Sequence, residues 1–360
     1  MNTRGCLVVK LVLLVLAVTH GPVLAQSLES AQVDLARPLP LKLAYPVGEI
    51  LHYRLDRRAL SYAVDGRRVG EVRSVAFFTR TRLPDHPELG VQEELAWDWF
   101  EHGQSLTDAP AEPRPFEPAE GFTLVFHPNT ADALERLDYS GVPATMDGFN
   151  FMIMTWDVFS FDGLARPNPH FPFPDSASVG EIVHETRGPH DFRFEFPPLV
   201  TDSRYSFSGQ NRARILGVST LGGEPSVIVE FSGAENPLEM TLNYGPFPIK
   251  VTGFEHLWGK SYLSLRDGRI VRGELAVHNT IVVQGPGVAE GEPLSLSEAS
   301  NIGDIQLQLL SPEEYERQRA ARFAAHSLAL VARGVPAPSP GWHPLAGCRV
   351  RGSRPDIPLP

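Results

Sequence analysis

Hydrophobic and polar residues alternate along most of the chain from about residue 48 to residue 310, the pattern of strands with one face on a core. The clearest case is Phe192–Phe196, where three phenylalanines alternate with Arg193 and Glu195. The other predicted strands are Gly48–Tyr62, Arg67–Leu83, Val91–His102, Arg204–Val218, Ser226–Phe231, Leu238–Asn243, Ile249–Leu265, Arg269–Val283 and Asp304–Leu310.

Tight turns separate several of these strands. Asp65-Gly66, Leu221-Gly222-Gly223 and Arg266-Asp267-Gly268-Arg269 place glycine where a hairpin needs positive φ. Parallel strands would need crossovers of about a dozen residues, so these short links favour an antiparallel meander. We predict a mainly β fold with a curved antiparallel sheet or sheets, half-barrel or sandwich-like, and a few helices.

Three segments predict helices. Met146–Asp162 has apolar residues at helical spacing, although a buried strand could have the same composition. Ala131–Tyr139 follows a possible N-cap at Asn129 or Thr130. A C-terminal helix is predicted from Ser311 to about Arg333, because Ser-Pro-Glu-Glu opens it as a capping box and Gly334 follows it.

The proline-rich segment 164–178 divides the chain into two predicted halves. We expect an N-terminal β-rich half over residues 26–163, and a C-terminal antiparallel meander with its helix over residues 179–333. Residues 334–360 are rich in proline with little periodicity, so we predict a disordered tail.

Residues 1–25 have the pattern of a secretory signal peptide. Arg4 and Lys10 supply positive charge, Leu11–Val18 is an apolar run, and Val23-Leu24-Ala25 has small residues at the cleavage positions. The run is shorter than the roughly 20 residues that span a bilayer. We therefore expect cleavage near Ala25, no transmembrane anchor in the mature chain, and a periplasmic or secreted bacterial protein.

Charge and cysteine content reduce the number of possible partners and sites. The formal net charge is −11, and the chain becomes more acidic when Arg4 and Lys10 are removed with the signal. Such a chain is a poor partner for nucleic acid, because phosphate binding relies on Lys and Arg patches. Cys6 also leaves with the signal, so Cys348 alone supports neither a disulfide framework nor a thiolate-rich metal site.

Sequence motifs for enzymatic chemistry are absent. The chain has no Gly-x-Ser-x-Gly elbow, phosphate-binding loop or dinucleotide fingerprint, so we predict no catalytic residue and no cofactor. The metal candidates His184 and His190, each followed by an acid, flank an apparent turn at Arg187-Gly188-Pro189. A hairpin there could form a zinc site, but solvated residues at the edge of a hairpin are the favoured interpretation.

Two further hypotheses concern the aromatic residues. The acids Glu93, Glu94, Asp98 and Glu101 lie beside Trp97 and Trp99, as in a glycan hydrolase with paired carboxylates, although core packing explains these tryptophans better. Curved sheets can also enclose apolar ligands. The candidate ligand-lining residues are Trp97, Trp99, Trp156 and Trp258, and a filled core would need the same residues.

Two stretches, Gly48–Arg54 and the hairpin Ser261–Thr280, resemble uncharacterised secreted bacterial β-sheet proteins, similar in outline to the half-barrels of periplasmic lipoprotein and lipid carriers. The resemblance implies a curved sheet and apolar cargo, and no functional residue. We expect a non-enzymatic extracytoplasmic protein whose partner is a hydrophobic small molecule or an envelope component. The alternatives are a secreted glycan hydrolase and an adaptor that binds another protein.

Overall fold

The computed structural model describes residues 34–128, 137–165, 174–187, 190–244, 247–285 and 295–332. It forms two units, Met1–Leu310 and Ser311–Pro360. The predicted signal peptide, Cys348 and the predicted tail lie outside the described residues, as does most of the helix predicted at Ala131–Tyr139. Along the described part of the chain, no helix is both long and apolar enough to cross a bilayer.

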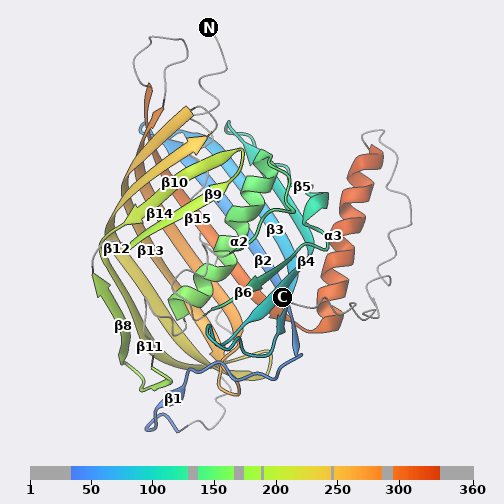
Figure 1. Ribbon diagram of the computed structural model, residues 1–360, viewed down its shortest axis with the longest axis vertical. Helices are drawn as coiled ribbons and strands as arrows, with labels where there is room; N and C mark the ends of the chain where they lie inside the picture. Colours follow the sequence, from blue (N-terminus) through green and yellow to red (C-terminus); the bar gives the residue numbers. More distant parts are fainter. Residues whose placement is uncertain are drawn as a thin grey trace, which may run out of the picture. The chain divides into compact units, whose positions relative to one another are not determined.

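An antiparallel sheet of 13 strands dominates the first unit and curves around a helix, as Figure 1 shows. Its neighbour order is β5-β4-β3-β2-β15-β14-β13-β12-β10-β9, with β11 and β8 continuing beside β12 and β6 beside β4. This confirms the predicted fold class. The strands are β2 (Ile50–Ala63), β3 (Arg68–Arg82), β4 (Glu93–Ser105), β5 (Arg114–Pro115), β6 (Thr123–Phe126), β8 (Ile182–Arg187), β9 (His190–Phe196), β10 (Val200–Phe207), β11 (Gln210–Leu221), β12 (Glu224–Tyr244), β13 (Phe247–Ser264), β14 (Ile270–Gly285) and β15 (Ser295–Leu310). A separate pair joins β1 (Leu39–Pro40) to β7 (Ser176–Ala177).

The long strand β12 organises one side of the sheet. Its first half pairs with β11 and its second half with β10. Strands β11 and β10 therefore lie end to end along the same edge of β12. The sequence predicted two strands here, Ser226–Phe231 and Leu238–Asn243. They are one strand, because an irregularity at Glu235, whose φ is 51°, bends the chain while pairing continues on both sides.

Strands from distant parts of the chain meet in the middle of the sheet. β2 pairs with β15, for example Leu55 with Leu307 and Ser61 with Asn301. Segments on both sides of the proline-rich residues 164–178 therefore belong to the same sheet.

Two α-helices form where the sequence predicted them: α2 (Met146–Ala165) and α3 (Pro312–Ala332). Helix α2 is apolar on nearly all sides, as expected of a helix enclosed by other elements. Helix α3, in the second unit, begins with the predicted cap, since the Glu314 N–H donates to Ser311 Oγ at 3.2 Å. A short 3-10 helix, η1 (Glu117–Ala119), follows β5.

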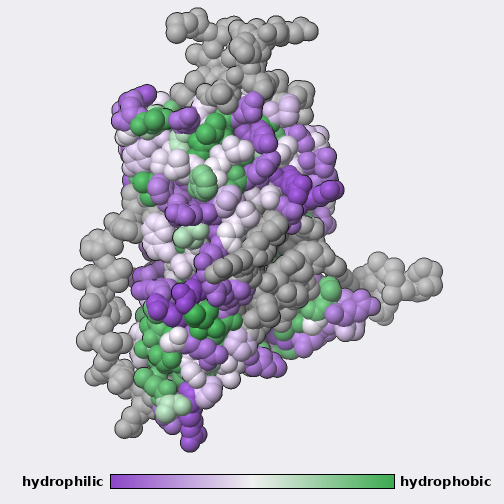
Figure 2. Space-filling view, turned by 90° about the vertical axis from the view of Figure 1, so that its left-hand side faces the viewer, coloured by the Kyte–Doolittle hydropathy of each residue, from purple (hydrophilic) through white to green (hydrophobic). Residues whose placement is uncertain are grey.

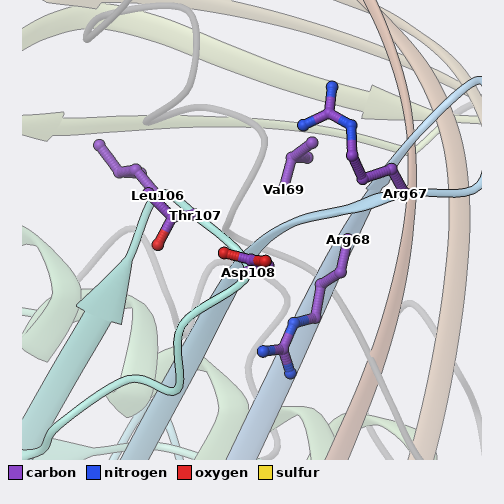
Figure 3. A pocket seen from close by; sticks show the side chains of 6 residues that line it. All are labelled: Arg67, Arg68, Val69, Leu106, Thr107 and Asp108. Carbon is purple, nitrogen blue, oxygen red and sulfur yellow. The ribbon is translucent and has the colours of Figure 1, made fainter.

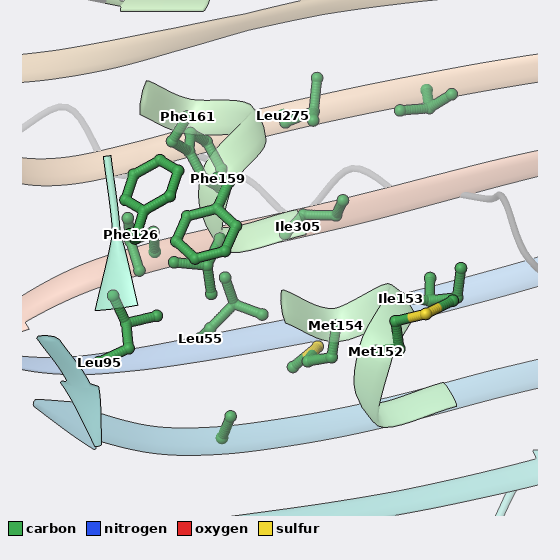
Figure 4. Close-up of a cluster of buried hydrophobic side chains, with 14 of the residues drawn as sticks. Leu55, Leu95, Phe126, Met152, Ile153, Met154, Phe159, Phe161, Leu275 and Ile305 are labelled. Carbon is green, nitrogen blue, oxygen red and sulfur yellow. The ribbon is translucent and has the colours of Figure 1, made fainter. Parts of the chain in front are cut away.

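The inner face of the sheet is defined here as the face that contacts α2. Figure 4 shows apolar side chains from β2, β4, β6, β14 and β15 gathered around this helix. They include Leu55, Leu95, Phe126, Leu275 and Ile305. Because strand side chains alternate between faces, every second residue of each strand is an inner residue.

A register shift in β4 corrects one expectation. Trp97 pairs with Phe78 and Trp99 with Phe77, so pairing skips one residue of β4. Strict alternation along the predicted strand Val91–His102 would put both tryptophans on one face. This bulge instead turns Trp97 to the inner face and Trp99 to the outer face, with Phe77.

Candidate functional site

Helix α2 touches both edges of the sheet and its middle. Trp156 and Phe149 pack against Phe194 and Phe196 of β9, with ring centroids 5.0 and 6.4 Å apart. On the opposite side Phe151 packs against Trp97 of β4, with centroids 4.9 Å apart. A single helix therefore fills the space between the two edges of the sheet.

A buried ion network fixes α2 to the sheet. The Arg80 guanidinium, 1% exposed, donates to Asp162 of α2 at 2.9 and 3.0 Å and to Glu93 of β4 at 2.9 Å. Arg80 also lies over the Tyr53 ring. Two carboxylates and one guanidinium share this dry site, so each charge depends on the others for compensation.

A second polar group lies one helical turn away from this network. Arg57 of β2 pairs with Asp157 of α2 at 3.3 Å. Burial raises the pKa of Asp157 to about 6, against the opposing effect of Arg57. Burial, and then the Arg57 charge, lower the pKa of His102 to about 3, and its Nδ1 lies 2.9 Å from Ser74 Oγ. His102 is therefore a neutral structural residue at ordinary pH.

A row of polar residues crosses the inner face away from these contacts. Five directly paired positions on five neighbouring strands form it: Asn236, Glu255, Asn279, Asn301 and Ser61. We call this set the polar row. All five are buried, in a face that otherwise carries mostly apolar side chains.

The two central amides of the polar row have no hydrogen-bond partner within the described residues. Asn279 is 0% exposed and Asn301 is 1% exposed, and neither Nδ2 nor Oδ1 of either is paired. Leaving a buried amide unpaired costs about 1–3 kcal/mol per group. Such a pair is therefore expected to have a partner when the protein functions.

Small residues flank Asn301 and Ser61 on the inner face. Ala299 and Gly303 lie two residues from Asn301 on β15, and Ala59 and Ala63 lie two residues from Ser61 on β2. The described contacts of α2 lie elsewhere: Phe161 reaches Gly273 on β14, about 20 Å along the strand from Asn279 at about 3.3 Å per residue. The polar row thus marks a different part of the interior from the helix contacts.

Glu255 of β13 lies between Asn236 and Asn279 in the polar row. Burial raises its pKa to about 7, and the Tyr205 hydroxyl, which donates to Oε2 at 3.3 Å, partly opposes this. Next to Glu255, at the β12 end of the row, Asn236 Nδ2 donates to Asn211 Oδ1 at 3.1 Å. The row can therefore be largely neutral and offers both donors and acceptors.

The four candidate tryptophans do not come together. Trp97 and Trp156 lie on the inner side, packed against other aromatic rings. Trp99 lies on the outer face, where its Nε1 donates to Glu101 at 3.4 Å. Trp258 is an outer residue of β13, 40% exposed.

The strands that carry His184 and His190 do not form a hairpin with each other. β8, with His184, pairs with β11, whereas β9, with His190, pairs with β10, so the two follow one another along the sheet. Gly188-Pro189 has the composition of a turn, but the strands on either side find different partners. The described ranges contain no cluster of three or more histidine, cysteine or acidic side chains that could hold a metal ion.

Two of the four candidate acids are also separated. Glu93 is on the inner face with Arg80, while Glu101 contacts Trp99 on the outer face. The sheet lies between these two acids, so they cannot act on one glycosidic bond.

Sequence reasoning missed Asn279 and Asn301. A signal was present, because strand alternation places Asn279 on the same face as Val277 and Ile281. Asn279 could have been identified as a polar residue at an inward position of an otherwise apolar strand.

A surface pocket lies beside the β2–β3 turn. Figure 3 shows a pocket of about 290 Å³ between the β2–β3 hairpin and the end of β4, lined by Arg67, Arg68, Val69, Leu106, Thr107 and Asp108. Its arginines already have acidic neighbours, with Arg67 3.7 Å from Asp65 and Arg68 3.8 Å from Glu71. On the side drawn in Figure 2, hydrophobic residues are interspersed with hydrophilic ones.

No family model matches the chain, and no curated protein matches it significantly by sequence. Lipovitellin, in a solved structure that describes its lipid–protein interactions, is 8% identical to this chain. The match has a TM-score of 0.36 and covers 74% of this chain and 25% of lipovitellin. The chain thus spans about a quarter of lipovitellin. An AttH protein of Nitrosomonas europaea is 10% identical, with a TM-score of 0.24, over 80% and 99% of the two chains.

An outer membrane lipoprotein-sorting protein domain from Vibrio parahaemolyticus is 8% identical, with a TM-score of 0.13, over 74% and 90% of the two chains. The resemblance to lipoprotein and lipid carriers expected from the sequence thus has weak structural counterparts.

Proposed function

We propose that this protein is a non-enzymatic extracytoplasmic protein that binds a hydrophobic ligand against the inner face of its sheet. The observation that carries the proposal is the unpaired Asn279–Asn301 pair, buried among small and apolar side chains. A protein whose interior served only as a core would gain stability from apolar residues at these positions.

The arrangement of the interior supports a ligand of limited size. Helix α2 fills the region near β4, β6 and β9 with aromatic contacts. The remaining region, along β13, β14, β15 and β2, has the polar row and the alanines and glycine beside it. Apolar pockets with a few converging polar groups are the usual form of small-molecule sites.

The extracytoplasmic location is part of the proposal and rests on the signal-peptide pattern of residues 1–25. Expression of the full chain in a Gram-negative host, fractionation, and N-terminal sequencing test it. We expect mature protein in the periplasm or medium, beginning at Gln26. Intact Met1 on protein recovered from the cytoplasm would contradict this location.

Native mass spectrometry of the protein purified from the periplasm without detergent tests the function. We expect a mass increment of an amphiphilic molecule, which organic extraction removes and identifies. The extracted protein should then bind the apolar fluorophore N-phenyl-1-naphthylamine. Clean apoprotein that also fails to bind this fluorophore would refute ligand binding, and co-purification of a protein would instead support the adaptor alternative.

A further inference from the structure

Asn279 and Asn301 face each other on adjacent antiparallel strands. Directly opposed residues have Cβ atoms about 5 Å apart, close enough for two amides to pair with each other. They do not, and both amide ends of both residues remain unpaired within the described ranges. The two side chains thus present two donor groups and two acceptor groups to one place on the inner face.

We propose that Asn279 and Asn301 together bind the uncharged, hydroxyl-bearing head of an amphiphilic ligand. This inference rests on the proposed function, because the apolar inner face would hold the hydrocarbon part. A hydroxyl both donates and accepts, so it satisfies an amide oxygen and an amide nitrogen at once.

The charges around the polar row exclude a charged head. The row has no lysine or arginine, and Glu255 lies directly beside Asn279. The nearest inner-face cation on β2, Arg57, is already paired with Asp157. A buried carboxylate or phosphate would therefore lack a counter-charge and lie close to an acid, which is costly in a dry interior.

The residues beside the two asparagines differ in size on the two strands. Ala299 and Gly303 flank Asn301 along β15, and Ala59 lies opposite Gly303 on β2. Larger inner residues, Val277 and Ile281, flank Asn279 on β14. The amides thus lie between a small-residue side, suited to the head, and an apolar side, suited to the chain.

A displacement assay tests the inference with the full mature chain. N-phenyl-1-naphthylamine is bound to the delipidated protein and displaced by oleyl alcohol, by oleate at pH 8, and by 1-octadecene, which share a chain length and differ in their heads. We expect oleyl alcohol to displace the fluorophore at a concentration about tenfold lower than either of the others, the effect of one or two net hydrogen bonds.

The double variant Asn279→Leu/Asn301→Leu should bind oleyl alcohol about tenfold more weakly and octadecene unchanged. The matched control is Thr280→Leu/Gln306→Leu, which makes similar changes at exposed positions of the same two strands and should keep the preference for the alcohol. If the double variant does not fold, the smaller change Asn279→Ser/Asn301→Ser takes its place.

The outcomes separate the two proposals. Equal displacement by all three compounds in the wild type, or an alcohol preference that survives the double variant, would overturn the role of the two asparagines and leave ligand binding intact. In that case buried water is the partner of the amides. Failure of the wild type to bind the fluorophore or any co-purified lipid would overturn the proposed function itself.

Discussion

Arg80 is held between Asp162 and Glu93 with almost no access to water. Replacing Asp162 by alanine should lower the free energy of unfolding by about 1–3 kcal/mol, because the buried Arg80 guanidinium keeps Glu93 but loses the carboxylate that accepts its other two hydrogen bonds. Urea unfolding followed by circular dichroism measures this. The triple replacement Arg80→Met/Glu93→Leu/Asp162→Leu removes all three charges and should recover most of the loss.

The exposed pair Lys250–Glu239, 2.8 Å apart with both side chains about half exposed, is the matched control. Lys250→Ala should change the free energy of unfolding by less than about 1 kcal/mol. Equal effects of Asp162→Ala and Lys250→Ala would show that the buried network does not hold α2 in place.

Gly273 illustrates how one residue can limit the position of a helix. A Cβ atom at this position would lie 2.5 Å from the Phe161 ring of α2. We expect Gly273→Val to destabilise the protein by about 1–3 kcal/mol, the usual cost of overpacking. Adding Phe161→Ala should recover part of this cost, and an additive double-variant effect in urea unfolding would contradict direct contact.

The strands of the sheet differ in how many neighbouring strands they pair with. β14 is paired along its length with both β13 and β15, whereas among the described strands β8 pairs with β11 alone. We expect native-state hydrogen exchange to show faster amide exchange in β8 than in β14, because local opening of an edge breaks fewer contacts. Equal protection in the two strands would contradict this order.

The elements also show what a sequence can predict. The apolar spacing of Phe149, Met152 and Trp156 gave α2 correctly, because helical periodicity persists even when a helix is buried on all sides. The bulge in β4 left no comparable signal, since it depends on how Phe77 and Phe78 pair across strands. Local composition likewise made Gly188-Pro189 look like a turn, whereas distant partners decide where β8 and β9 lie.

The same limit applies to the site. The tryptophans were predicted to line a ligand site because aromatic residues are common in such sites. Trp99 and Trp258 are outer residues of the sheet. The polar row is assembled from five strands, and only their register shows that Asn236, Glu255 and Asn279 are neighbours. Hydropathy predicts which face is buried, but not which buried polar residues meet.

For the whole molecule, Glu255 should make stability depend on pH. Burial raises its pKa from 4.5 to about 7, so the folded state holds a proton that the unfolded state has lost between these values. This contribution is fully present below pH 4.5 and is lost as pH rises through 7. His102, with its pKa lowered to about 3, acts in the opposite direction below pH 6.5.

Glu255→Gln isolates the effect. Compared with the wild type, this variant should gain stability as pH rises from 5 to 8, by an amount on the order of 1–3 kcal/mol. Urea midpoints at both pH values measure the difference. Tyr205→Phe, which removes a hydrogen bond that favours the ionised carboxylate, should steepen the loss instead. A stability difference between Glu255→Gln and wild type that is the same at both pH values would contradict the assignment.

The pairing of β2 with β15 has a consequence for how the protein acquires its fold. β2 is the first long strand to be synthesised and β15 the last, so the centre of the sheet cannot close until nearly the whole chain is present. Contacts between such distant segments slow folding, because a large loop must be ordered before they form. Such a chain remains incompletely folded during its synthesis. An incompletely folded chain is also the form that can pass through a translocation channel.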